Sequence, residues 1–163
     1  NIDSLARARD LVDLAKYDEA EQLTELILKE DPGNKEALIL RLLIYCNRSD
    51  QAALFAYVTH IESIFPVFPE MHFILGTYHE SKKQFSKATS SYSKVVFIDR
   101  AYIQAREKLL RLNIQMGNHT LVSREAKNIL LQLSEKTYKQ FETALIPKVN
   151  LAQLDELCRN SIR

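Results

Sequence analysis

A period of 34 residues constrains this chain more than any other feature. Pro32 and Pro66 lie 34 positions apart, and each follows an apolar stretch with helical spacing. Positions separated by multiples of 34 also share their residue type without any gap. The columns are Ile27, Ile61, Val95 and Ile129, then Ala20, Leu54, Ala88 and Val122, then Ala8, Leu42, Gly76 and Leu110. Such a period is typical of stacked supersecondary units, so the chain divides into units 1–34, 35–68, 69–102 and 103–136, with 137–163 left over.

Each unit is expected to contain two helices. In the third unit, residues 71–83 and 85–98 are two amphipathic stretches that a short polar turn separates. Phe85, Ala88 and Tyr92 recur at spacings of three and four residues, which places them on one face of a helix. Antiparallel helix pairs are joined by short connections of this kind. The sequence therefore predicts an all-α protein.

Glycine is scarce, and each glycine has a structural role in this scheme. The chain contains only 3 glycines among 163 residues, too few and too far apart for a Walker loop or a dinucleotide-binding fingerprint. Gly33 precedes Asn34, which is expected to cap the next helix. Gly76 lies within a predicted helix, where it is tolerated if a neighbouring helix approaches closely. Gly117 is expected at an inter-helix turn with left-handed backbone.

These residues resemble those of a known repeat family. A 34-residue helix–turn–helix unit with Leu75-Gly76, then Phe85, Ala88 and Tyr92, and a terminal proline is similar to the tetratricopeptide repeat. The resemblance covers residues 1–136, although Arg7-Ala8 and Ser134 depart from the family pattern. It implies a right-handed superhelical α-solenoid of four repeats, followed by C-terminal capping helices.

The resemblance also implies where a partner binds. In the family, the first helix of each pair lines a concave groove, and this groove takes a peptide or helix of another protein. The corresponding positions of this chain mix aliphatic, polar and charged side chains. They are Leu5, Arg9, Val12, Asp13, Glu36, Ile39, Leu43, Asn47, Glu70, Phe73, Thr77, Glu80, Gln104, Glu107, Arg111, Ile114 and Gln115.

Composition argues against several other functions. The formal net charge is +1 and the isoelectric point is about 7.9, which does not favour a nucleic-acid partner. The pattern shows no signal peptide and no membrane-inserted segment. Cys46 and Cys158 lack metal-type spacing and are expected to be free thiols in a cytoplasmic protein. No nucleophile, base and orienting group come together in the sequence, so we expect no catalytic site, metal or small-molecule cofactor.

The acidic residues are concentrated near the N-terminus. Residues 1–34 carry nine acidic and four basic side chains. A charged face in contact with solvent is the simpler interpretation of this cluster, and electrostatic steering of a partner is the alternative.

The last 27 residues differ from the repeats. Residues 138–145 are predicted to form a helix that Ile146-Pro147 ends, and Asn150 is predicted to cap a second, Leu-rich helix. A solenoid must cover the apolar side of its last helix pair, so this helix is expected to cap the stack. The alternative is a helix that docks on a missing domain or on a partner.

A narrower resemblance concerns the second half of the chain. Residues 69–109, 123–133 and 146–162 are similar to the tetratricopeptide extensions of some chemoreceptor glutamate methyltransferases. This resemblance implies a regulatory or targeting domain whose partner is a chemoreceptor or the catalytic domain of the same chain. The start at Asn1 and the stop at Arg163 fit an excised fragment. A chaperone of secretion or pilus assembly is the alternative function.

Overall fold

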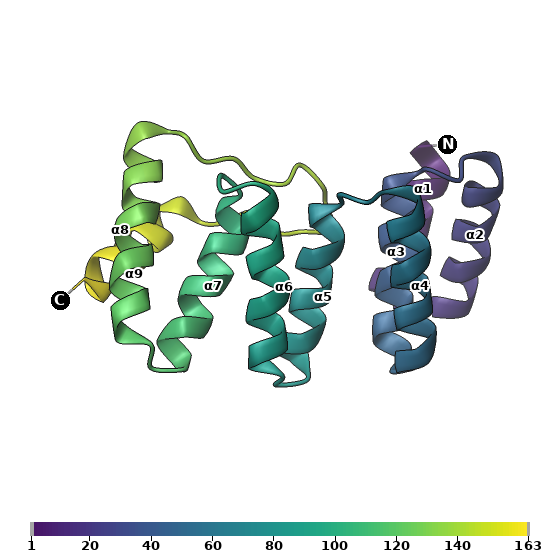
Figure 1. The fold of residues 1–163 in the computed structure, drawn as a ribbon. Helices are drawn as coiled ribbons and strands as arrows, with labels where there is room; N and C mark the ends of the chain where they lie inside the picture. Colours follow the sequence, from purple (N-terminus) through teal and green to yellow (C-terminus); the bar gives the residue numbers. More distant parts are fainter. Residues whose placement is uncertain (1, 163) are drawn as a thin grey trace. The chain divides into compact units, whose positions relative to one another are not determined.

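The computed structural model describes residues 2–162, and this part of the chain contains nine α-helices and no strand. Figure 1 shows them as α1 to α9. Each predicted unit contains two of the first eight helices, whereas the repeat boundaries themselves stay a prediction. The bounds are α1 Ile2–Asp13, α2 Tyr17–Glu30, α3 Lys35–Arg48, α4 Gln51–Ile64, α5 Pro69–Ser81, α6 Phe85–Ile98, α7 Ile103–Gln115, α8 His119–Glu135 and α9 Leu151–Ser161.

The chain forms two compact units, one ending at Met71 and the other beginning at His72. In the first unit, side-chain caps set the start of two helices. The Asn34 side chain accepts a hydrogen bond from the backbone N–H of Ala37 at 3.0 Å, which confirms the predicted cap of α3. Asp50 caps α4 in the same way. Leu11 of α1, Ala20 of α2 and Ile44 of α3 pack together in one cluster. Further buried side chains of α3 and α4 are Leu38, Leu40, Leu42, Leu54 and Ile61.

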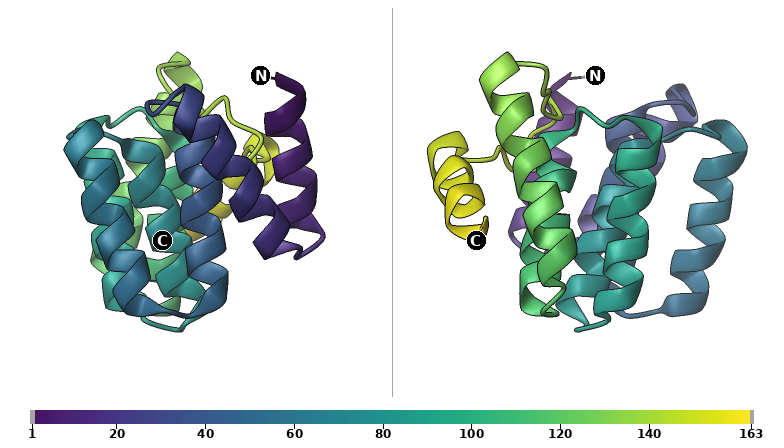
Figure 2. Two further views of the ribbon diagram at one scale, coloured as in Figure 1. Left: turned by 90° about the vertical axis from the view of Figure 1, so that its right-hand side faces the viewer. Right: turned by 60° about the vertical axis from the view of Figure 1, so that its left-hand side comes forward.

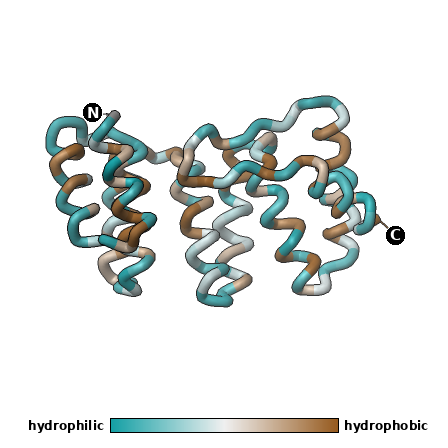
Figure 3. Tube along the Cα trace, turned by 180° about the vertical axis from the view of Figure 1, so that it is seen from behind, coloured by the Kyte–Doolittle hydropathy of each residue, from teal (hydrophilic) through white to brown (hydrophobic). Residues whose placement is uncertain are grey.

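Apolar and polar positions alternate along the helices, as Figure 3 shows by colour. In the second unit, this pattern buries Tyr92 of α6 completely. A Cβ atom added at Gly76 would lie 2.6 Å from the Tyr92 ring, so the predicted close approach at this glycine is confirmed. Gly117 has a φ of 75° in the turn between α7 and α8, which confirms its predicted left-handed backbone.

The predicted helix over residues 138–145 is wrong. After α8, residues 137–149 form an irregular, largely extended segment, which we call the strap. Figure 1 shows the strap leaving α8, reaching α5 and turning back toward α9. Tyr138, Phe141 and Leu145 have helical spacing, but the strap bonds to the backbone and side chains of α7 and of the turn before it, so it has no need of helical hydrogen bonds.

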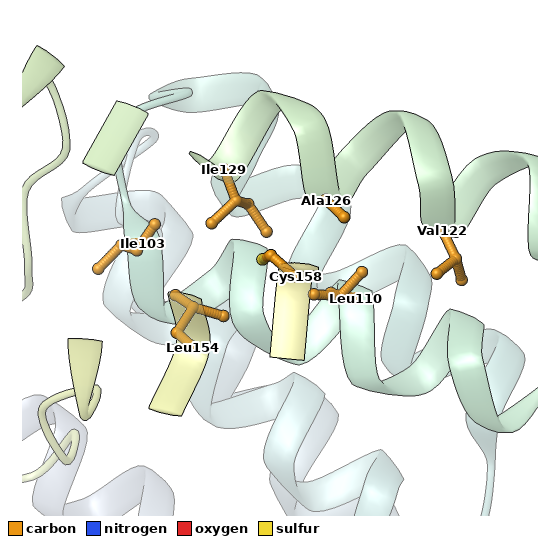
Figure 4. Close-up of a cluster of buried hydrophobic side chains, with 7 residues drawn as sticks. All are labelled: Ile103, Leu110, Val122, Ala126, Ile129, Leu154 and Cys158. Carbon is orange, nitrogen blue, oxygen red and sulfur yellow. The ribbon is translucent and has the colours of Figure 1, made fainter. Parts of the chain in front are cut away.

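The second C-terminal helix forms as predicted. Asn150 caps α9 by accepting a hydrogen bond from the backbone N–H of Gln153 at 3.1 Å. Leu154 and Cys158 of α9 are fully buried. Figure 4 shows them against α7 and α8, and the right-hand view of Figure 2 shows α9 beside α8. Their partners in this cluster are Ile103, Leu110, Val122, Ala126 and Ile129. The helix therefore covers apolar side chains of the last helix pair.

Candidate protein-binding surface

In the first unit, α1 and α3 carry seven of the predicted groove residues on what we call the α1–α3 surface. These residues are Leu5, Arg9, Val12, Asp13, Glu36, Leu43 and Asn47, all at least partly exposed. Nε of Arg9 lies 2.8 Å from Oε1 of Glu36, and both side chains are about one-third exposed. An ion pair therefore links the two helices at a position that solvent and a partner can reach.

One predicted residue does not belong to this surface. Ile39 is only 3% exposed, so it contributes to the core and is not available for binding. Asn47 donates a hydrogen bond to the carbonyl oxygen of Leu43 at 2.8 Å, one turn earlier in α3. Asp13 is exposed at the end of α1 and has a solvent-facing carboxylate. The surface thus offers aliphatic stems together with acidic and basic groups, which suits a peptide or helix.

Part of the acidic cluster is structural, which the sequence pattern did not indicate. Arg48 of α3 pairs with both Glu21 and Asp18 of α2, and Arg41 pairs with Glu21 at 3.5 Å. These partners are 20, 27 and 30 residues apart in the sequence. Local spacing rules for ion pairs reach only three or four residues along a helix, so no local signal marked this network.

In the second unit, two predicted groove residues are covered by the strap. Phe73 of α5 is 4% exposed and Gln104 of α7 is 1% exposed, so neither is available at the surface. The ring of Phe141 contacts Phe73 edge-on at a centroid distance of 5.7 Å. It also stacks on Tyr102 at 4.0 Å, with an interplanar angle of 16°. The strap therefore occupies the region where the resemblance places a ligand.

Backbone hydrogen bonds hold the strap beside the start of α7. The N–H of Lys139 donates to the carbonyl of Ala101 at 2.8 Å, and the N–H of Ile103 donates to the carbonyl of Lys139 at 3.0 Å. This is a parallel bridge of the kind found between β-strands. The Lys139 ammonium also pairs with the Asp99 carboxylate, and this bond lowers the pKa of Asp99.

The side chain of Gln104 binds the strap at two points. Its Oε1 accepts from the N–H of Phe141 at 2.5 Å, and its Nε2 donates to the carbonyl of Pro147 at 3.0 Å. Gln140 closes the strap on itself, because its Oε1 accepts from the N–H of Val149 at 2.8 Å. A buried amide that binds two backbone groups recognises an extended chain without regard to its side chains.

Thr77 and Glu80 of α5 contact the hydroxyl group of a buried tyrosine. The Tyr92 hydroxyl donates to the Glu80 carboxylate at 2.8 Å and lies 3.2 Å from the Thr77 hydroxyl. Burial raises the pKa of Tyr92, so it stays a hydrogen-bond donor at neutral pH. Nζ of Lys108 lies 3.8 Å from the same carboxylate oxygen of Glu80. Glu80 is therefore partly engaged within the unit.

The remaining predicted residues are partly or fully exposed. Glu107 and Arg111 form an ion pair one turn apart on α7, at 3.4 Å. Ile114 of α7 is 40% exposed and lines a pocket together with residues of α8 and α9. Gln115 is exposed and Glu70 is partly exposed.

Few of the described side chains have properties that suggest a reactive group or a metal site. Both cysteines are free, with Cys158 buried and Cys46 partly buried. Burial raises the pKa of Cys46 to about 12 and that of Cys158 to about 11, so both are unreactive thiols at neutral pH. Residues 2–162 contain no group of three or more side chains that could hold a metal ion. No helix in this range is long and apolar enough to cross a membrane.

Comparison with solved structures identifies the fold. Residues 41 to the end of MamA from Desulfovibrio magneticus RS-1 are 15% identical, with a TM-score of 0.60 over 81% of this chain and 75% of that one. A tetratricopeptide repeat protein from Parabacteroides merdae is 14% identical, with a TM-score of 0.62 over 98% of this chain and 59% of that one. The fold is that of a tetratricopeptide α-solenoid.

A third similar structure is a multi-protein complex. A chain of Naa15/Naa10 bound to HypK-THB is 18% identical, with a TM-score of 0.66 over 82% of this chain and 20% of that one. The sequence itself matches no protein-family model and no curated relative. These comparisons give no support to the narrower resemblance to methyltransferase extensions.

Proposed function

We propose that this chain is a non-catalytic interaction domain that binds a segment or helix of a partner protein along its α1–α3 surface. The observation that carries the proposal is the strap. In the second unit, an extended segment lies against α5 and the start of α7 and is held by backbone bonds, Gln104 and aromatic contacts. The helices of this chain thus hold an extended segment where the fold family places a ligand.

The α1–α3 surface supports the proposal because its side chains remain at least partly exposed and the Arg9–Glu36 pair gives it a defined polar centre. Partially exposed ion pairs contribute little to stability, because solvent screens them. Their charges are therefore available for selecting a partner at small cost to the fold.

The test is capture of partners by the full chain. Arg9→Glu places two acidic groups side by side, and we expect it to abolish capture of the proteins that the native chain retains. Lys29→Glu changes the same charge on an exposed site of α2 and should retain them. Both variants should show native circular dichroism. Unchanged capture by Arg9→Glu would refute the assignment of this surface.

The narrower proposal is that the domain regulates or targets a chemotaxis-type methyltransferase in the cytoplasm. It rests on the sequence resemblance, and the two free thiols agree with a reducing compartment. The sequence of the intact gene tests it cheaply. An upstream methyltransferase domain would support the proposal, whereas a short stand-alone reading frame would favour a chaperone of secretion or pilus assembly.

A further inference from the structure

Four side chains each contact a different part of the extended strap. We call these contact residues, Phe73, Asp99, Tyr102 and Gln104, the aromatic cleft, and all of them lie within the second compact unit. Phe73 and Tyr102 enclose the ring of Phe141 on an edge and on a face. Asp99 binds a lysine, and Gln104 binds the backbone. The cleft therefore has one aromatic pocket, one anionic site and one amide that binds main-chain groups.

The spacing of the occupied sites gives a motif. Successive side chains of an extended chain point to opposite sides, so residues two apart share a side. Lys139 and Phe141 are two apart, and their side chains occupy the anionic site and the aromatic pocket respectively. Lys139 Nζ also lies 4.9 Å from the centroid of the Tyr102 ring, which adds a cation–π contact. A basic residue two positions before an aromatic one satisfies both sites at once.

We propose that the aromatic cleft is a recognition site for an extended partner peptide with a basic residue two positions before an aromatic residue, and that residues 139–141 are its built-in competitor. This inference rests on the proposed function and names the chemistry of one partner segment. The strap joins α8 to α9, and α9 is anchored by Leu154 and Cys158 in a cluster against which Tyr138 and Val149, near the two ends of the strap, also pack. The middle of the strap can consequently leave the cleft while its ends and α9 stay in place.

Because the strap is part of the chain, it competes strongly with a free peptide for the aromatic cleft. A tethered segment acts at an effective concentration on the order of millimolar, so a free peptide must overcome it. We expect the native chain to bind such a peptide weakly and a chain with an emptied cleft to bind it at least tenfold more tightly.

The experiment uses the full chain and a fluorescein-labelled peptide of residues 137–149, TYKQFETALIPKV. The emptied chain carries Lys139→Ala and Phe141→Ala, and fluorescence anisotropy measures the dissociation constant. We expect the gain in affinity to vanish when the peptide carries Phe141→Ala or Lys139→Glu. Adding Gln104→Ala to the emptied chain should weaken binding at least tenfold. Gln153→Ala, an exposed glutamine of α9 outside the predicted groove, is the matched control and should have no effect.

Three results would overturn the proposal. The emptied chain could keep native circular dichroism yet fail to bind the peptide. The Lys139→Glu peptide could bind as well as the native one. Size-exclusion chromatography could show a native dimer that Phe141→Ala converts to monomer, in which case the occupant is a second copy of the chain.

Should the emptied chain fail to fold, hydrogen exchange on the native chain decides. Excess peptide should increase exchange within residues 138–149, and unchanged exchange would overturn the proposal. The Arg9→Glu experiment probes a different surface, so each result can fail without the other.

Discussion

Gly76→Ala tests the close approach of α5 and α6 in the second unit. An ideal Cβ at this position would lie 2.6 Å from Cε1, 2.8 Å from Cδ1 and 2.8 Å from Cζ of Tyr92. Contacts between carbon atoms are favourable only at about 3.5–4.0 Å, so the ring has to move by about 1 Å. Tyr92 is fully buried, and its hydroxyl is bonded to Glu80. The ring therefore cannot move without disturbing packing and a hydrogen bond.

Two effects oppose each other in this variant. Alanine stabilises a helix interior by about 1 kcal/mol relative to glycine. Overpacking of a well-packed core costs about 1–3 kcal/mol, and weakening the Tyr92–Glu80 bond costs about 1 kcal/mol more. We expect a net loss of about 1–3 kcal/mol, confined to the second unit.

Urea unfolding followed by circular dichroism measures the loss, and hydrogen exchange in α5 and α6 locates it. Gly117→Ala is the contrasting control. A Cβ at this position meets nothing within 4 Å, but a φ of 75° is strained for alanine, so its loss of stability comes from the backbone and not from overpacking. Gly117→Asn should recover part of that loss, because asparagine tolerates left-handed backbone, whereas Gly76→Asn should recover nothing. A stabilisation of about 1 kcal/mol by Gly76→Ala would refute the reasoning, since it would show helix propensity acting alone.

Three further predictions concern other parts of the chain. The Asp99 pKa is lowered in the folded state, so its pairing with Lys139 stabilises the strap above the ordinary pKa of 3.8 and is lost as the pH falls through the folded value. The protection of the strap amides against hydrogen exchange, relative to their intrinsic exchange rate at each pH, should therefore fall in acid, and Asp99→Asn should remove that dependence. The Tyr57 hydroxyl is buried without a hydrogen-bond partner, so Tyr57→Phe should leave the free energy of unfolding unchanged or raise it by up to about 1 kcal/mol; a loss of more than about 1 kcal/mol in urea unfolding would contradict this. Cys158 should resist alkylation at pH 7.5 while α9 is docked, and Leu154→Ala should accelerate its labelling by weakening that docking; equal labelling rates measured by mass spectrometry would count against it.

The helix pairs were predictable because their signals are local and repeated. Spacings of three and four residues placed Ala88 and Tyr92 on one face of α6, and the structure buries both. Asn34 and Asn150 act on backbone groups only three residues away, so capping rules found them. Glycine destabilises a helix interior, so Gly76 within a helical pattern indicated a close contact with a neighbouring helix.

The strap was not predictable, because its bonding partners are distant in the sequence. Gln104 binds Phe141 and Pro147, which lie 37 and 43 positions later in the sequence. No residue near position 141 indicates such a partner. The helical spacing of Tyr138, Phe141 and Leu145 therefore gave the wrong local structure. The same error affected the candidate surface, since Phe73 and Gln104 were predicted to face a ligand without the segment that covers them.

The return of the chain to α5 has a consequence for its synthesis. In a stacked array, each helix pair contacts its neighbours, so folding can proceed as the chain emerges from the ribosome. Leu11, Ala20 and Ile44 of the first unit pack on one another, so this part of the core can form once α3 has been made. By contrast, Phe73 and Gln104 can make their contacts with Phe141 only after that residue has been made. Ile129 likewise packs on Leu154 and Cys158 only after those residues have been made. The second unit therefore completes its core only once residue 158 has been made, and a nascent chain stalled at residue 136 would present these apolar side chains to chaperones and proteases.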